Sequence, residues 1–213
     1  MTTRRDLLKG FLGLSALAFA DVRELRLGNL LPPGDPAHPG ALLGVEEAQR
    51  TAGLLRVKLL WASSGEILVG REAPATLSVP FLAAGPPQAG PVRPRVFRVA
   101  SSPRFRREVL ARFGKGHRVV DWHPALDRFG AEQLNERFHR RFGRPMDEVA
   151  WRGWMAVKIA AEVALRGGIL QQLGDSGFDG HKGTQLRFGE DHYLVQPVYV
   201  VDAKGKMVEE VAV

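Results

Sequence analysis

The sequence of 213 residues contains no cysteine, which excludes disulfide bonds, thiol nucleophiles, cysteine-bound zinc, iron–sulfur clusters and S-linked lipid anchors. Beyond its first twenty residues it also has no apolar run of about 20 residues, the length that a membrane-spanning helix needs. Hydrophobic residues make up 45% and charged residues 25%, so the whole chain is not disordered, collagen-like or a coiled coil. These values are typical of a globular protein with one large domain or two small ones.

The first twenty residues have the parts of an export signal. Arg4 and Arg5 lie in a charged start, residues 11–20 are apolar, and Ala18-Phe19-Ala20 has small residues where signal peptidase prefers them. The pattern Thr-Arg-Arg-x-Leu-Leu-Lys resembles twin-arginine signals, which carry folded proteins across a membrane. We therefore predict a signal at 1–20 and a periplasmic or extracytoplasmic protein. Two alternatives stay open: a signal retained as a membrane anchor, and an ordinary amphipathic helix.

The charge of the chain is basic. It has a formal net charge of +7, and residues 1–20 contribute two of these positive charges. Much of the remainder lies in one stretch that contains a single acidic residue, Glu108: Arg104, Arg106, Arg107, Arg112, Lys115 and Arg118. The sequence has no recognised DNA-reading motif and no aromatic platform for stacking bases, so nucleic acid is not an expected partner. A solvated helix face is the preferred interpretation, followed by attraction to anionic lipid or an acidic protein.

The remaining chain alternates strands and helices. Strands are predicted at 25–31, 55–61, 79–83, 95–99 and 118–122. Helices are predicted at 41–52, 71–77, 103–113, 131–142 and 148–166. A further pair of strands at 193–201 and 207–213 flanks a hairpin turn, and residues 85–94 form a proline-rich linker. We predict a single α/β domain over 21–213: a mostly parallel sheet flanked by helices, with a C-terminal antiparallel hairpin.

One group of side chains has the composition of a metal site. His117, Asp121 and His123 are close in sequence, and residues 121 and 123 of a strand share one face. Pro124 and the apolar neighbours favour a loop that leaves a strand, so metal binding is the weaker interpretation. A small exported enzyme, or a carrier of a metal or cofactor, is nevertheless the alternative function, with these three residues as its first candidates.

The second half of the chain resembles a known family. Val120-Asp121-Trp122-His123-Pro124, together with residues 129–138 and 142–147, resembles type I periplasmic solute-binding proteins, the leucine/isoleucine/valine-binding-protein-like components of ABC transporters. Residues 151–158 are similar to the subgroup associated with PQQ-dependent alcohol dehydrogenase systems, and segments near 178–183 and 196–200 complete the pattern. The resemblance is specific over 118–201 and weak over 21–100.

The resemblance implies a non-catalytic solute-binding or accessory component, with no cofactor. Family members have two lobes that close on a ligand, whereas here only a basic helix and one strand separate Phe97 from Trp122, so we expect the second lobe to be largely missing. The implied partners are a small-molecule ligand and an ABC permease or alcohol-dehydrogenase system. A second copy, paired through the face of the missing lobe, is a further expected partner.

The resemblance also implies where a ligand binds. In open α/β sheets, ligand contacts come from loops at the carboxyl ends of the strands. The matching loops in this sequence are 31–35, 62–65 and 83–85. The residues predicted to contact the ligand are Pro33, Ser63, Ser64, Ala84 and Gly85. Ordinary turn chemistry is the alternative explanation for these residues.

Overall fold

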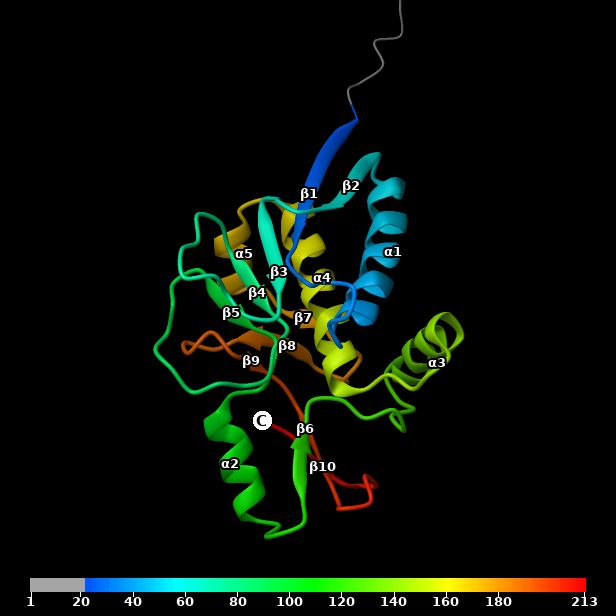
Figure 1. The fold of residues 1–213 in the computed structure, drawn as a ribbon, viewed down its shortest axis with the longest axis vertical. Coiled ribbons are helices and arrows are strands. Elements are labelled where there is room, and N and C mark those ends of the chain that lie inside the picture. Colours follow the sequence, from blue (N-terminus) through cyan, green and yellow to red (C-terminus); the bar gives the residue numbers. More distant parts are fainter. Residues whose placement is uncertain (1–21) are drawn as a thin grey trace, which may run out of the picture.

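The computed structural model describes residues 22–213, so the predicted signal lies outside the described residues. The main sheet has five parallel strands in the order β2-β1-β3-β4-β5, and all of their carboxyl ends meet at one edge (Figure 1). The strands are β1 (Arg23–Asn29), β2 (Val57–Ala62), β3 (Ile67–Gly70), β4 (Phe81–Ala83) and β5 (Val96–Arg98). The predicted mostly parallel sheet and the α/β fold class are confirmed.

Two helices, α1 (His38–Leu54) and α4 (Glu148–Arg166), cover one face of this sheet. Asp147 caps α4, because its carboxylate accepts a hydrogen bond from the Ala150 N–H at 2.8 Å, and the helix ends where Gly167 takes a φ of 79°. The apolar side of α4 is fully buried against the sheet and α1. This packing forms the main hydrophobic core of the protein.

Glycines let α1 and α4 approach closely. A Cβ atom at Gly40 would overlap the Ala150 carbonyl, and one at Gly153 would overlap the Ala37 carbonyl. We therefore expect Gly40→Ala to lower the free energy of unfolding by about 1–3 kcal/mol, because the two helices must move apart. Gly53→Ala is the matched control in the same helix, since that site has open space. It should leave stability unchanged or raise it by up to about 1 kcal/mol. Urea unfolding would measure both, and equal effects would refute the close-packing argument.

The opposite face of the sheet is only partly covered. The segment 71–80 packs Ala73 and Leu77 over Phe81, whereas the β1–β2 end carries charged side chains, including Glu24 and Lys58, whose ion pair measures 2.8 Å. No crossover helix joins β2 to β3. Instead residues 63–66 pass across β1 beside Gly28, where a Cβ atom would meet the Gly65 backbone. Parallel sheets normally have both faces covered, so this open face departs from the usual arrangement.

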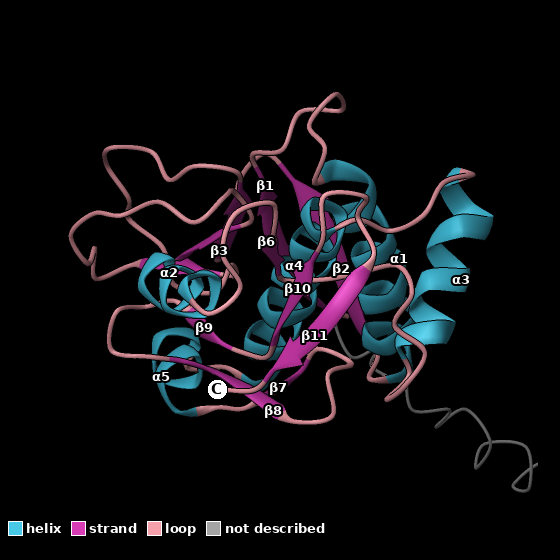
Figure 2. Ribbon diagram, turned by 90° about the horizontal axis from the view of Figure 1, so that it is seen from below, coloured by secondary structure: helices cyan, strands magenta, loops and turns pink. Residues whose placement is uncertain are grey.

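A smaller layer lies next to the carboxyl edge of the main sheet (Figure 1). Its antiparallel sheet has the order β11-β10-β6, with strands β6 (Arg118–Val120), β10 (Val198–Val201) and β11 (Met207–Val211). The helix α2 (Pro103–Ala111) packs on it through Val109, and Figure 2 shows β10 and β11 side by side. The predicted C-terminal hairpin is confirmed as β10 and β11.

The remaining elements surround α4. They are α3 (Ala131–Phe142), α5 (Ile169–Asp175), β7 (Phe178–Asp179), β8 (Gln185–Phe188) and β9 (Leu194–Val195). The helix predicted at 71–77 is wrong, since this segment is irregular: Arg93 donates hydrogen bonds to the carbonyls of Ala73, Pro74 and Ala75. The strands β3, β7 and β8 and the helix α5 were not predicted. Within residues 22–213 no helix has the length and hydrophobicity needed to cross a bilayer.

Candidate functional site

A buried polar network lies where the chain passes between the main sheet and the smaller layer. Asp121 follows β6 and is fully buried. The Ser101 hydroxyl donates to its Oδ1 atom at 2.6 Å, and Arg106 Nη1 lies 3.0 Å from the same atom. Arg152 of α4 approaches the other oxygen, Oδ2, at 3.2 Å. Asp121 thus connects the segment after β5, the helix α2, the segment after β6 and α4.

Three segments of the chain join the main sheet to the smaller layer: one follows β5, one follows β6 and one lies between β9 and β10. Lys182 extends the network to the third of them. Its ammonium donates to the Gln196 side chain at 2.7 Å, to the Pro197 carbonyl at 3.0 Å and to the Asp121 carbonyl. Gln196 Nε2 in turn donates to the Val99 carbonyl at 2.7 Å. Hydrogen bonds therefore link all three segments that join the two layers, and these segments are where the layers would hinge.

The network holds two strongly perturbed ionisable groups. Burial alone would raise the pKa of Asp121, but the guanidinium groups of Arg106 and Arg152, with the ammonium of Lys182, hold that pKa below its usual value. Burial lowers the pKa of Lys182 to about 7, although the carboxylate of Asp121 opposes the shift. The charged form of Asp121 stabilises the charged form of Lys182, and the reverse also holds. Removal of either charge should therefore lower the stability of the whole cluster.

Aromatic rings enclose the ammonium of Lys182. Its Nζ lies 4.3 Å from the centre of the Trp151 ring and 5.2 Å from that of Tyr199, both cation–π contacts. Trp122 stacks on Trp151 with the ring centres 5.6 Å apart, and its Nε1 donates to Asn135 at 2.9 Å. The tryptophans therefore belong to the core and to the wall of the network.

The three candidate metal ligands do not converge. The Asp121 carboxylate faces the arginines, His123 Nε2 lies 2.9 Å from the Gly205 carbonyl, and His117 packs near Phe113. In the described part of the chain, no three His, Cys, Asp or Glu side chains are placed to hold a metal ion. The alternative interpretation in which His117, Asp121 and His123 form a metal site is therefore wrong.

Two of the three predicted ligand loops come together at the carboxyl edge of the sheet. Ala84 and Gly85 are buried at the end of β4, and a Cβ atom at Gly85 would overlap the Arg71 carbonyl. Arg71 Nη1 lies 3.6 Å from Asp35 Oδ2, which connects it to the loop that contains the exposed Pro33. Arg71 was not among the predicted site residues, because the sequence predicts a helix at 71–77.

The third loop follows the carboxyl end of β2, at the same edge of the sheet but separated from β4 by β1 and β3. Ser63 and Ser64 are exposed in the connection that crosses β1 beside Gly28. From β2 the connection crosses β1 and leads directly into β3 on the other side of β1. Gly28 of β1 accordingly pairs with Ala62 of β2, and Leu27 pairs with Ile67 of β3. Ser63 and Ser64 thus do not line the pocket beside Gly85, and their contact with a ligand stays a prediction.

A small polar pocket adjoins Gly85. Its volume is about 150 Å³, and arginines dominate its lining: Arg71, Arg93 and Arg98, with Glu72 and Gln88 beside them. Arg93 donates to backbone carbonyls. The guanidinium carbon of Arg98 lies over the Tyr193 ring, 5.2 Å from its centre, in a cation–π contact. Arg71 and Arg98 thus supply positive charge at this pocket.

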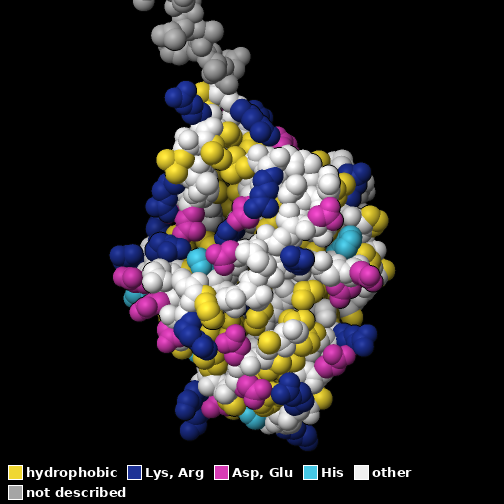
Figure 3. Space-filling view, turned by 180° about the vertical axis from the view of Figure 1, so that it is seen from behind, with side chains coloured by type: hydrophobic (Ala, Val, Ile, Leu, Met, Phe, Trp, Pro, Cys, Tyr) yellow, Lys and Arg dark blue, Asp and Glu magenta, His cyan; other side chains and the backbone are white. Residues whose placement is uncertain are grey.

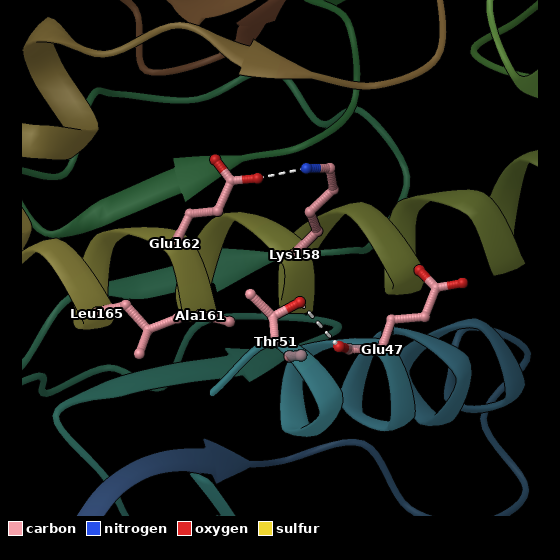
Figure 4. A pocket seen from close by; sticks show the side chains of 8 residues that line it. Glu47, Thr51, Lys158, Ala161, Glu162 and Leu165 are labelled. Atoms are coloured by element: carbon pink, nitrogen blue, oxygen red, sulfur yellow. Dashed lines mark hydrogen bonds and ion pairs between the residues drawn. The ribbon is translucent and has the colours of Figure 1, made fainter. Parts of the chain in front are cut away.

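A second hollow, of about 270 Å³, lies between α1 and α4 (Figure 4). Its floor is formed by small residues, and its rim carries Glu47 and Glu162. Glu47 already accepts hydrogen bonds from Trp154 Nε1 and Arg137 Nε, each at 2.8 Å, and Glu162 pairs with Lys158. The contacts of Glu47 connect α1 to α3 and α4, whereas the pair of Glu162 with Lys158 lies within α4. We therefore assign the hollow to helix packing.

Comparison with known proteins identifies the fold. No family model and no curated protein sequence matches the chain. Among solved structures, the leucine-binding protein LivK from Thermotoga maritima aligns with a TM-score of 0.66 at 10% identity, over 90% of this chain and 99% of that one. An ABC transporter substrate-binding protein from Desulfitobacterium hafniense, in complex with Leu, gives 0.66 at 12% identity, over 89% and 100%.

A third structure agrees with these two. LivJ from Streptococcus pneumoniae, a branched-chain amino acid transporter substrate-binding protein in complex with isoleucine, aligns with a TM-score of 0.63 at 12% identity, over 90% of this chain and 99% of that one. At such identities the likeness concerns the fold. The chain therefore has the fold of the substrate-binding proteins of branched-chain amino acid ABC transporters, and it resembles them in structure.

Proposed function

We propose that this chain is a non-catalytic, exported binding component that captures a small organic carboxylate for an ABC transport system. The observation that carries the proposal is the arginine pocket at the carboxyl edge of a sheet with the substrate-binding-protein fold. Ligands bind at this edge in open α/β sheets, and a guanidinium group recognises a carboxylate through charge-assisted hydrogen bonds. Export through a twin-arginine signal at 1–20, and an ABC permease as partner, belong to the same proposal.

The link to alcohol oxidation is a finer part of this proposal and rests on the resemblance of residues 151–158 to the PQQ-associated subgroup. Trp151 and Trp154 of this segment are buried in the core, so the segment itself is not a contact surface for a partner. PQQ and short alcohols therefore belong in the ligand screen. A response to either, without a response to carboxylates, would replace transport by an accessory role in alcohol oxidation.

The proposal is tested by ligand binding to the full chain. A thermal-shift screen of amino acids, including leucine and isoleucine, of short carboxylic acids, of short alcohols and of PQQ identifies a ligand, and calorimetry then gives its affinity. Arg98→Gln should weaken carboxylate binding by about 10- to 100-fold, the effect of losing a hydrogen bond to a charged group. Arg107→Gln removes an exposed arginine from α2 and is the control for net charge.

Two results would overturn the assignment. One is unchanged carboxylate affinity in Arg98→Gln, which would place the ligand elsewhere. The other is a ligand without an anionic group, since the arginines then have no role in recognition. Light scattering of the ligand-bound protein measures its molar mass and so tests whether a second copy of the chain pairs with it. A dimer that covers the pocket would have twice the mass of one chain.

A further inference from the structure

Three exposed apolar residues gather at the end of the molecule opposite the candidate site. Leu54 is 86% exposed, Leu55 60% and Val22 58%. Leu54 is the last residue of α1, and Leu55 lies in the turn between α1 and β2. Because Arg23 pairs with Val57, Val22 lies beside Arg56 in the same turn. We call this group, with Arg56, the α1–β2 tip. Apolar side chains that cluster at such high exposure mark a surface that contacts a partner.

The backbone fixes the direction of the two leucines. The Leu55 N–H donates to the Ala52 carbonyl at 3.0 Å, and the Arg56 N–H donates to the Gly53 carbonyl at 3.1 Å. Arg56 has a φ of 55°, a left-handed conformation that glycine normally occupies at the end of a helix. An arginine at this strained position keeps a positive charge next to the leucines, and strain of this kind is concentrated at functional surfaces.

Basic side chains surround the apolar ones. Arg50 precedes Leu54 by one helical turn and is exposed, as are Arg23 and Arg56. Figure 3 shows Lys, Arg and hydrophobic side chains together around the base of the grey segment. The combination of protruding apolar residues with a basic rim is the composition of a surface that binds anionic lipid headgroups.

The N-terminal sequence identifies the occupant. The apolar stretch 11–20 is separated from Val22 by Asp21 alone, and one residue spans at most about 3.6 Å. A membrane that held residues 11–20 would therefore lie against the tip. We propose that the α1–β2 tip rests on an anionic bilayer and that it acts together with residues 11–20, since stable membrane attachment generally needs two signals. The inference rests on the export that the proposed function includes and on the alternative in which the signal is retained as a membrane anchor.

Vesicle flotation of the full chain tests the tip. With vesicles of phosphatidylglycerol and phosphatidylcholine, Leu54→Ser/Leu55→Ser should lower the partition coefficient by about tenfold or more. The matched control is Val195→Ser/Val208→Ser, which removes two exposed valines from β9 and β11, away from the tip, and should leave the partition coefficient unchanged. Arg50→Gln/Arg56→Gln should also weaken partition, by about fivefold or more, whereas Arg107→Gln/Lys115→Gln has the same net charge and should not. All eight substituted residues are exposed, so folding is retained in the four double variants.

A fluorescent label reports position directly. Because the chain has no cysteine, Leu55→Cys can carry a single environment-sensitive fluorophore. Its emission should shift to the blue on anionic vesicles, whereas a label at Val208→Cys should not respond. Unchanged emission at position 55, or partition unaffected by the tip variants, would show that residues 11–20 bind alone and would overturn the inference. So would lipid-free self-association that Leu54→Ser/Leu55→Ser abolishes. Carboxylate affinity in the same variants distinguishes this failure from failure of the proposed function.

Discussion

Asp121→Asn is expected to lower the free energy of unfolding by about 3–5 kcal/mol, the cost of leaving buried charges without their partner. The carboxylate compensates the positive charges of Arg106, Arg152 and Lys182 inside the protein. It also accepts a hydrogen bond from the Ser101 hydroxyl. Asparagine has a similar shape but no charge, and its amide N–H group would face a guanidinium. The loss therefore comes from electrostatics and not from a cavity.

Urea unfolding at pH 7 measures this effect, with Asp127→Asn as the control in the same loop. Asp127 is exposed, so its substitution should change stability by less than about 0.5 kcal/mol. Adding Arg152→Met to Asp121→Asn should restore part of the lost stability, because one uncompensated charge is removed. Equal destabilisation by the two asparagine substitutions, or additive losses in the double variant, would refute the charge argument.

Lys182 should make the protein more stable as the pH rises above neutrality. In the folded state its pKa is about 7, whereas the ordinary value is 10.5. Between these two values the unfolded chain binds more protons than the folded protein, so the free energy of unfolding increases with pH. At about 1.4 kcal/mol per pH unit, the gain between pH 7 and pH 9 should be about 2 kcal/mol. Below pH 7 the full penalty of burying the ammonium remains.

Denaturant unfolding at several pH values between 6.5 and 9.5 tests this expectation. Lys182→Met removes the titrating group and should flatten the pH dependence, whatever it does to stability itself. Lys115→Met is the control, because Lys115 is exposed and should leave the slope unchanged. If the slope persists in Lys182→Met, another group is responsible for it.

The alternation of strands and helices was predictable wherever local signals were strong. Asp147 and Gly167 mark the ends of α4 in the sequence, and the hairpin after Val201 is equally clear. The strand β3 was missed because its four residues come soon after Ser63-Ser64-Gly65, a segment that indicates the end of a strand. No helix between β2 and β3 marks the start of a new strand. The predicted helix at 71–77 failed because its carbonyls bind Arg93, a partner about twenty residues away.

The candidate site was predictable only in part. Ala84 and Gly85 were placed correctly at the edge of the sheet, because the carboxyl end of β4 is visible in the sequence. Arg71 and Arg98 were not selected, since a lone arginine in a sequence is most often solvated. The pairing of Asp121 with Lys182 joins residues 61 positions apart, and no local pattern records it. The arginine pocket and the Asp121–Lys182 contact both depend on tertiary contacts, which the periodicity of the sequence does not encode.

The position of β1 has a mechanical consequence. The chain enters the fold through β1, which pairs with β2 from Arg23 to Gly28 and with β3 from Leu27 to Asn29. Residues 63–66 cross this strand, and the Glu66 N–H donates to the Arg26 carbonyl at 2.9 Å. A force applied through an N-terminal tether would therefore pull along a strand held on both sides, and it would load these hydrogen bonds together in shear. A tether on the edge strand β11 would instead open its ladder one bond at a time, so the N-terminus is the mechanically stronger point of attachment.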